Sequence, residues 1–295
     1  MNILVSGGTG FVGSHLVEVL VEKGHQVAIL TRQQKRSKDA RITYLQWNGK
    51  EIPMGIGIYD AVINLTGAGI ADSKWTPARK KILHDSRILP TKALVNYINK
   101  SPRTPQVFLQ ISAVGYYGNN PSGTQTEDSP LGDGYLAELG VQWEAAAQPA
   151  KCRTVLMRLG VVLGDGGFLD RLLPVYRFYL GGKLGDGKQP LPWIHIGDVV
   201  KSMIFCLEKE TIEGPVNLVA PELVDQKTFS KEFADVMGVA DIWTIPKFAL
   251  EFLFGEMSAV LLGGQRVLPK KLQDTGFEFE HPELEDALED LLGED

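Results

Sequence analysis

The chain has 295 residues, of which 44% are hydrophobic and 22% charged, and its formal net charge is −6. This composition is ordinary for a globular protein. The acidic balance argues against a nucleic-acid partner, which requires a basic face, and no apolar run is long enough to span a membrane. The N-terminus lacks a signal-peptide pattern, and Cys152 and Cys206 lack metal-ligand spacing, so we expect a cytoplasmic protein without a metal site.

Short apolar segments alternate with helical patterns over the first 165 residues. We expect strands at 2–6, 25–31, 41–47, 59–67, 106–112 and 153–163, and helices at 12–22, 76–100 and 135–150. The strands are apolar throughout, as in parallel sheets that helices cover on both faces. This pattern predicts an α/β fold with a Rossmann-type, doubly wound parallel sheet.

After residue 165 the chain becomes rich in Gly and Pro, although helical patterns recur at 198–209, 226–238, 247–262 and 283–292. The change predicts a Rossmann domain over 1–165, to which later segments are able to return. Residues 166–295 are then a smaller, mixed substrate lobe. The helical face at 76–100 is compatible with a homodimer as well as with packing on the sheet.

The first expected strand ends in SGGTGFVG, which places three glycines between that strand and an amphipathic helix. Glycine permits the sharp turn, close approach of a diphosphate to the backbone, and tight packing of the helix on the strand. The diphosphate then binds N–H groups at the start of the helix, where the dipole favours anions. We therefore predict a dinucleotide site formed by Gly7, Thr9, Gly10, Phe11, Val12 and Gly13.

The end of the second expected strand bears on the choice of cofactor. An NAD site usually has an acidic residue here for the ribose hydroxyls, but this chain reads TRQQKRSK and has no acid before Asp39. Arg32 directly follows Thr31 at the strand end, where a guanidinium can pair with a 2′-phosphate. The pattern predicts NADP in preference to NAD, with Thr31 and Arg32 in the site; the alternative is a solvated basic loop.

Motifs along nearly the whole chain carry a family resemblance. SGGTGFVG, DAVINLTGAGI and ISAVGYYG together resemble the extended short-chain dehydrogenase/reductase superfamily. The stretches MRLGVVLGDGG, PWIHIGDVV and GEMSAVLLGGQRVLPKKLQDTGFEF are similar to its atypical, YfcH-like branch, the epimerase family. The resemblance implies a Rossmann domain, NADP binding and a family-specific helical segment at 245–293.

The resemblance also assigns a second part of the cofactor site. Leu65, Thr66 and Gly67 match the turn after the fourth strand, which runs along the ribose and diphosphate of the cofactor. Arg87, in HDSRILPTKAL, has two interpretations. It is either a cation that faces a cofactor or substrate phosphate, or a partner in a surface ion pair with Asp85.

The superfamily's catalytic signature, Tyr-x-x-x-Lys, is incomplete in this chain. The family places a Ser or Thr at the end of the fifth strand, here Ser112 and Ala113, and Tyr135 matches the signature tyrosine. Leu139 stands four residues later, where the family has the lysine that lowers the tyrosine pKa. A phenol with a pKa near 10 is a poor base at neutral pH without such help.

Three hypotheses follow from the missing lysine. The protein is an enzyme with altered chemistry, in which Ser112, Tyr116, Tyr117 or Glu138 acts as acid or base. Alternatively, Tyr135 still works with a cation borrowed from elsewhere, such as Arg158 or Lys183. Finally, the fold has kept NADP(H) and lost the reaction, leaving a sensor or scaffold. An enzyme would exchange hydride with an unidentified carbonyl or alcohol, a nucleotide sugar included, by epimerisation or reduction. We expect Tyr135, Ser112 and Tyr116 as catalytic residues, with Ser112 also lining the cofactor.

Overall fold

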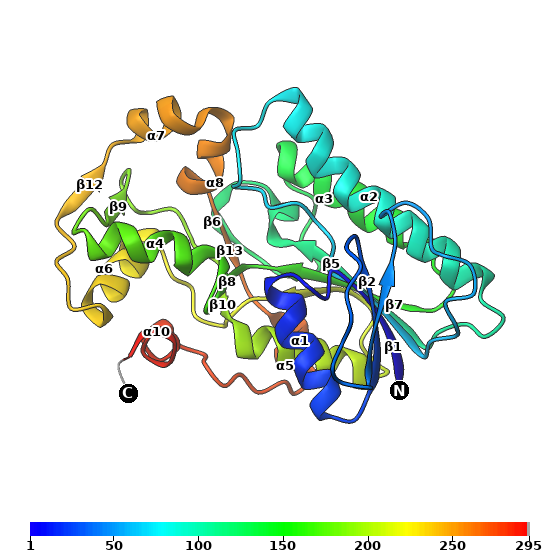
Figure 1. The fold of residues 1–295 in the computed structure, drawn as a ribbon. Helices are drawn as coiled ribbons and strands as arrows, with labels where there is room; N and C mark the ends of the chain where they lie inside the picture. The colour runs from blue at the N-terminus through cyan, green and yellow to red at the C-terminus, as the bar shows by residue number, and fades with distance from the viewer. Residues whose placement is uncertain (294–295) are drawn as a thin grey trace.

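The computed structural model, which describes residues 1–293, is built around a seven-stranded sheet whose strands all run parallel (Figure 1). Its order, β11-β7-β5-β4-β1-β2-β3, confirms the doubly wound sheet predicted from the apolar strands. The strands are β1 (Asn2–Ser6), β2 (Gln26–Thr31), β3 (Ile42–Gln46), β4 (Ala61–Asn64), β5 (Val107–Ala113), β7 (Arg153–Leu159) and β11 (Gly214–Leu218).

Helices cover both faces of this sheet, as the apolar strands require (Figure 1). Ile3 and Val5 of β1 face α1 (Phe11–Glu22) and α5 (Ile196–Glu208), whereas Leu4 faces the side covered by α2 (Pro77–Lys100). The helix α3 (Tyr135–Ala147) packs against α2. Residues 193–218 therefore return to the sheet from beyond residue 165, through α5 and β11.

The register brings the carboxyl ends of the central strands to one edge. Ser6, the last residue of β1, pairs with Leu30 of β2 on one side and with Asn64 of β4 on the other. The loops that begin at Gly7, after Thr31 and at Leu65 consequently leave the sheet side by side. Ligands of open α/β sheets bind at such an edge.

Short elements build the smaller lobe. The expected strand at 153–163 divides at Gly160, because a Cβ there would lie 2.7 Å from the carbonyl oxygen of Pro192. The expected helix at 247–262 divides at Gly255, whose φ is +58°. The elements are η1 (Val114–Tyr117), β6 (Asn120–Gln125), β8 (Val161–Leu163), α4 (Gly167–Arg177), β9 (Gly182–Leu184), β10 (Trp193–His195), α6 (Gln226–Val236), β12 (Trp243–Ile245), α7 (Lys247–Phe254), η2 (Gly255–Met257), α8 (Ser258–Leu262), β13 (Gln265–Val267), α9 (Lys270–Asp274) and α10 (Leu284–Leu292).

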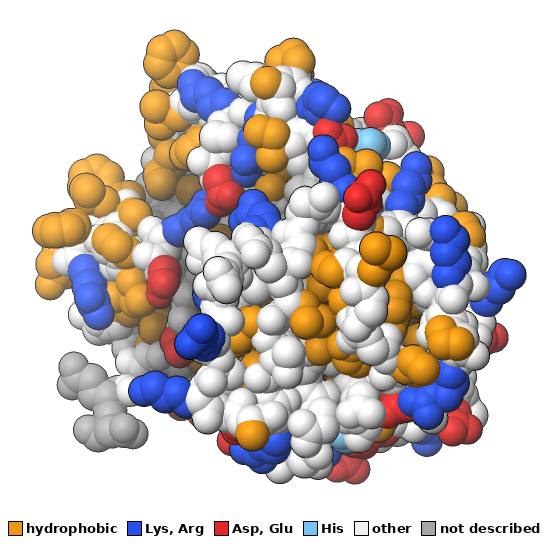
Figure 2. All heavy atoms as spheres, turned by 45° about the vertical axis from the view of Figure 1, so that its right-hand side comes forward, with side chains coloured by type: hydrophobic (Ala, Val, Ile, Leu, Met, Phe, Trp, Pro, Cys, Tyr) orange, Lys and Arg blue, Asp and Glu red, His pale blue; other side chains and the backbone are white. Residues whose placement is uncertain are grey.

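The lobe has its own apolar core, formed by α4, α6 and α10. The short strands are held by distant partners, since β12 pairs with β9 and β13 with β6. None of the helices between residues 1 and 293 has the length and apolar content of a bilayer span. In the view of Figure 2, basic and acidic side chains are interspersed, and hydrophobic side chains appear at the upper and left margins and also right of the centre of the face.

The smaller lobe contains a partly buried carboxyl group whose ionised form is disfavoured by its surroundings. Glu232 of α6 has a buried Oε2 without a hydrogen-bond partner, and burial together with Glu222 and Glu285 raises its pKa to about 7. A folded-state pKa above the unfolded value stabilises the fold at low pH, and this stability is lost as pH rises through 7. We expect Glu232→Gln to raise the free energy of unfolding at pH 8 by about 1 kcal/mol, since solvent screens a half-exposed carboxylate, and by much less at pH 5.

Urea unfolding of the wild-type protein and the variant at the two pH values measures this difference. Glu210→Gln, at an exposed position, is the matched control. An equal effect of Glu232→Gln at both pH values would show that the charge of Glu232 is not its cause.

Candidate cofactor and substrate site

The glycine loop between β1 and α1 leaves no room for side chains at two of its positions. Gly7 has a φ of +81°, and a Cβ there would lie 2.7 Å from the carbonyl of Leu65. A Cβ on Gly13 would lie 2.2 Å from the carbonyl oxygen of Gly7. Gly10 is the N-cap residue of α1 and provides no side-chain cap. The first N–H groups of α1, which have no acceptor within the helix, therefore face the exposed tip of the loop.

A second glycine-rich turn packs on this loop. Cβ atoms on Gly164 and Gly166 would both lie 2.8 Å from the ring of Phe11. Across the same turn, Asp165 lies 3.0 Å from Nε2 of His15 on α1. The contact between the stretch LGDGG and the glycine loop was not predicted from the sequence, although the glycines of LGDGG are a signal for close packing. The glycine loop and the start of α4 thus pack against each other through Phe11.

The end of β2 places a free cation beside the glycine loop. Thr31 is buried and its Oγ1 accepts a hydrogen bond from the Gln33 N–H at 3.3 Å. Arg32 is exposed, and no carboxylate within residues 1–293 lies in ion-pair range of it. Its guanidinium is therefore available to an anion at the carboxyl edge of β1 and β2.

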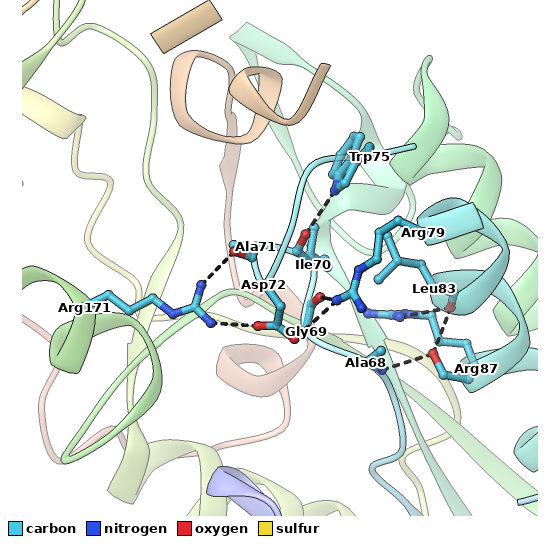
Figure 3. A network of polar contacts seen from close by, with 11 residues as sticks. Ala68, Gly69, Ile70, Ala71, Asp72, Trp75, Arg79, Leu83, Arg87 and Arg171 are labelled. Atoms are coloured by element: carbon cyan, nitrogen blue, oxygen red, sulfur yellow. Dashed lines mark hydrogen bonds and ion pairs between the residues drawn. The ribbon is translucent and has the colours of Figure 1, made fainter. Parts of the chain in front are cut away.

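The loop between β4 and α2 is fastened on both sides of the groove (Figure 3). From α4, Arg171 donates to Asp72 Oδ1 at 2.7 Å and to the carbonyl oxygen of Ala71 at 2.9 Å. From α2, Arg79 contacts Asp72 at 3.2 Å and also donates to the Gly69 carbonyl oxygen. The sequence analysis missed both arginines, because exposed charges near a loop carry no specific pattern. These contacts join the two lobes above the edge of the sheet.

Arg87 lies inside the protein and not in a surface ion pair. Asp85 instead contacts Lys81 and His84. The Arg87 side chain is buried, its guanidinium lies 4.9 Å from the Trp143 ring centre, and Nη1 donates to the Leu83 carbonyl oxygen at 3.0 Å. Burial lowers the pKa of Arg87 to about 10. The structure thus excludes the surface ion pair with Asp85, whereas contact of Arg87 with a cofactor or substrate phosphate stays a prediction.

Tyr135 begins α3 and lines a cavity of about 480 Å³. Trp75 forms another wall, with its ring centre 5.1 Å from that of Tyr135, and α7, η2 and α8 close the outer side. The Tyr135 hydroxyl donates to the Lys80 carbonyl oxygen at 3.2 Å. Burial raises the pKa of this phenol, while the cations Arg87, Lys80 and Arg79 act in the opposite direction. The net shift of the pKa is upward, so the Tyr135 hydroxyl holds its proton at neutral pH.

Ser112 lies beneath the site and not in the cavity. Its side chain is buried, and its hydroxyl donates to Glu144 Oε1 at 2.7 Å. Glu144 in turn forms a two-point ion pair with Arg158, in which both N···O distances are 2.8 Å. The guanidinium of Arg158 stacks 3.5 Å from the Tyr116 ring centre. Arg158 is thus already neutralised by Glu144, and Ser112 and Tyr116 belong to the packing around this buried pair.

Tyr117 and the turn after β4 are fixed in similar ways. The Tyr117 hydroxyl donates to Asn217 Oδ1 at 2.7 Å and accepts from Arg158 at 2.9 Å. Thr66 donates its hydroxyl to Asn64 Oδ1 at 2.5 Å. Tyr117 therefore supports the sheet, whereas Leu65 packs against Gly7 of the glycine loop and Gly67 lies against Arg87.

Two further features lie away from the carboxyl edge. A cavity of about 730 Å³ lies between α1, α5 and residues 276–291 and is lined by none of the predicted site residues. At its rim, ligand atoms of His195, His281 and Asp290 lie within 4.8 Å of one another. His195 Nδ1 accepts a hydrogen bond from the Gly197 N–H, so the ring proton is on Nε2. That nitrogen lies 3.2 Å from Asp290 Oδ2, while the Nδ1 contact of His195 caps the N-terminus of α5.

Two family models match most of the chain. The model of the NAD dependent epimerase/dehydratase family matches residues 3–219, from β1 through β11. The chain belongs to this family. A second model, of a domain of unknown function called DUF1731, matches residues 245–291 of this epimerase-family protein. The second segment includes α7, η2 and α8, the outer wall of the cavity beside Tyr135.

Relatives of this family share the full length of the chain. It is 38% identical over 300 residues to the epimerase family protein YfhF of Bacillus subtilis, covering 100% of this chain and 99% of the relative. It is 39% identical to the epimerase family protein SERP0438 of Staphylococcus epidermidis, with 98% of each chain covered. The family resemblance read from the sequence motifs is thereby confirmed.

Solved structures extend the comparison. The human epimerase family protein SDR39U1, solved with NADPH, is 32% identical and superposes with a TM-score of 0.90 over 99% of both chains. A nucleoside-diphosphate sugar epimerase from Corynebacterium glutamicum is 28% identical, with a TM-score of 0.80, and is covered over 58% of its length. The epimerase-family protein described here therefore has a nucleotide-binding fold, with NAD- and NADP-bound structures among its neighbours.

Proposed function

We propose that this protein binds NADP(H) across the carboxyl edge of the sheet and exchanges hydride with a small carbonyl or alcohol in the cavity beside Tyr135. The glycine loop carries the proposal, because Gly7 and Gly13 pack the turn and the start of α1 too closely for side chains, as in loops that present helix N–H groups to a diphosphate. The human relative solved with NADPH supports it. When bound, the cofactor supplies the hydride.

The preference for the phosphorylated cofactor is assigned to Arg32. Its exposed side chain follows β2 directly and has no carboxylate partner within the described chain. A phosphate monoester on the cofactor ribose would give this guanidinium a charge-assisted, two-point contact. Discrimination of about 10-fold or more is expected from one such contact, which contributes about 1.5–3 kcal/mol.

We expect Arg32→Glu to remove the preference for NADPH over NADH, because a carboxylate repels the 2′-phosphate and can accept the ribose hydroxyls of NADH. Calorimetric titration of both cofactors into the wild-type protein and the variant measures the two affinities. Arg103→Glu, an exposed arginine at the opposite edge, controls for the change in net charge. A preference that survives Arg32→Glu would assign the phosphate to another group.

The proposed function allows two reactions, reduction and epimerisation. Reduction ends after one hydride transfer, whereas epimerisation returns the hydride to the other face of a keto intermediate. The nucleoside-diphosphate sugar epimerase from Corynebacterium glutamicum supports a nucleotide sugar as one candidate. In reduction, Tyr135 on the wall of the cavity would donate a proton to the substrate oxygen. In epimerisation its phenolate would first accept the alcohol proton and then return it.

A second candidate function is binding of NADP(H) without turnover, as in a sensor or scaffold. It is favoured by Leu139 in place of the lysine and by the Ser112 hydroxyl, which Glu144 already occupies. Incubation of the NADPH-loaded protein with a library of carbonyl compounds, followed by absorbance at the nicotinamide band, separates the two functions. Oxidation of NADPH that Tyr135→Phe abolishes supports the enzyme; tight binding without oxidation supports the sensor.

A further inference from the structure

Arg87 is a buried cation that has no counter-ion. No carboxylate among residues 1–293 lies within ion-pair distance of its guanidinium, which is enclosed by α2, α3 and the loop after β4. The other cations around that loop are paired: Arg79 and Arg171 share Asp72, and Lys80 contacts Glu256. An unpaired charge is costly to bury, so the position of Arg87 calls for an explanation beyond packing.

The guanidinium lies along the face of α3 that carries Tyr135. Tyr135, Leu139 and Trp143 are spaced four residues apart and therefore share one side of the helix. The guanidinium lies over Trp143, at the end of that row. The cation thus comes from the neighbouring helix α2 to the face where a lysine at position 139 would project.

The free edge of the guanidinium is turned toward the loop after β4. A Cβ on Gly67 would lie 3.3 Å from Cζ and 3.4 Å from Nη2 of Arg87, so the glycine lets the loop approach the guanidinium closely. Nη1, by contrast, is used by the Leu83 carbonyl oxygen. Figure 3 shows Arg87 extending from α2 toward the loop that contains Ala68 and Gly69.

The charges that face Tyr135 come from several elements. Arg79, Lys80 and Arg87 project from α2, and the Lys80 Nζ lies 4.8 Å from the centre of the tyrosine ring. Across the cavity, α7 contributes Lys247 and Glu251, which pair with each other, and η2 contributes Glu256, which pairs with Lys80. Of these groups, Arg87 alone has no carboxylate against it within the described residues.

We propose that Arg87 supplies from α2 the positive charge that the related dehydrogenases draw from a lysine on the tyrosine helix, and so stabilises the ionised form of Tyr135. The inference rests on the proposed function and says which cation stabilises the ionised form of its proton donor. Arg87 acts through Tyr135 and is a positioning residue. Leu139 is then the consequence of a relocated charge, not of a lost reaction.

The chemical step in the direction of reduction is balanced. Hydride adds to the carbonyl carbon of the substrate, and the electron pair of the C=O π bond moves to the oxygen. The O–H bond of Tyr135 breaks, and its proton passes to that oxygen. The phenolate that remains beside Arg87 regains a proton from water before the next turnover.

The test is the titration of Tyr135 itself. The protein, with tyrosine labelled at Cζ with carbon-13, is titrated by NMR with and without NADPH, and Tyr135→Phe identifies the signal among the eight tyrosines. We expect Arg87→Gln to raise the pKa of Tyr135 by about 1 or more, as for loss of a nearby opposite charge. Arg87→Lys should leave it near the wild-type value, and Arg103→Gln, far from the cavity, should not move it.

The variants distinguish an effect of the Arg87 charge on Tyr135 from an effect of the packing of Arg87. An unchanged Tyr135 pKa in Arg87→Gln overturns the inference, as does an equal rise in Arg87→Lys, which keeps the charge. If Arg87→Gln does not fold, the pKa of Tyr135 is measured in the double variant Arg87→Gln/Leu139→Lys instead, because this variant places the cation on α3. A wild-type Tyr135 pKa in the double variant supports the inference, and a raised one overturns it. Failure of the wild-type protein to bind NADPH would instead refute the proposed function.

Discussion

Gly13→Ala is expected to abolish NADPH binding and to lower the free energy of unfolding by about 3 kcal/mol, the upper range for overpacking. The new Cβ would lie 2.2 Å from the Gly7 carbonyl oxygen and 2.8 Å from the Gly8 Cα. Both neighbours are backbone atoms, so the loop must move as a whole. Because the diphosphate of the proposed site would contact N–H groups of that loop, affinity should fall at least about 100-fold, the loss of two charge-assisted hydrogen bonds.

Gly10→Ala separates the two effects. Its Cβ would meet only the Gly7 carbonyl oxygen, at 3.3 Å, and the backbone at Gly10 is extended, so alanine fits. We expect a stability loss of about 1 kcal/mol at the N-cap but a fall in NADPH affinity of about 10-fold or more, since the methyl group occupies the anion's approach. Calorimetry for binding and urea unfolding for stability measure both; wild-type NADPH affinity in the two variants would place the diphosphate elsewhere.

The fold could largely be predicted because its strongest signals are local. The glycines at 7, 10 and 13 mark the turn from β1 to α1, as expected from the sequence, and α2 begins with Thr76 as its cap and Pro77 at its first position, near the expected start at 76. The buried strands are apolar throughout, which is sufficient to identify a parallel sheet covered on both faces. These features depend on neighbouring residues alone.

The elements that were missed depend on distant contacts. β13 pairs with β6 although about 145 residues separate them, and each has few residues and little hydrophobic pattern. The helix α4 was not predicted because it begins at two glycines and contains Pro174, which argue against a helix by propensity. Tertiary packing of Leu169 and Tyr176 into the lobe core overrides that preference.

In the candidate site, too, some features could be predicted from the local sequence and others depend on distant contacts. That position 139 lacks a lysine is visible in the sequence, but the direction of Arg87 is not, since charged residues occur on several sides of α2. The engagement of Ser112 is also invisible, because Glu144 and Arg158 are brought beneath it by two different elements, α3 and β7. A motif gives the position of a residue along the chain, whereas its partners follow from how helices cross the sheet.

Glu144→Ala is expected to lower the free energy of unfolding by about 3–5 kcal/mol, the cost of leaving one member of a buried ion pair without the other. The side chains of Glu144 and Arg158 are 6% and 4% exposed, so water cannot replace the lost contact. Ser112 would also lose the acceptor of its hydroxyl proton. Urea unfolding at pH 7 measures the change, and Asp85→Ala, which breaks the exposed Lys81–Asp85 pair on α2, should cost below about 0.5 kcal/mol.

The double variant Glu144→Leu/Arg158→Met tests whether the pair is retained for stability. Removing both charges leaves no uncompensated ion, so we expect it to be more stable than Glu144→Ala. Its Tyr116 ring, however, loses the guanidinium that stacks 3.5 Å away, and the turn that contains it borders the cavity side of α3. If the double variant folds stably and still binds NADPH with wild-type affinity, Ser112, Glu144 and Arg158 support the sheet without contacting the cofactor. A fall in affinity with stability intact would instead return Ser112 to the cofactor site.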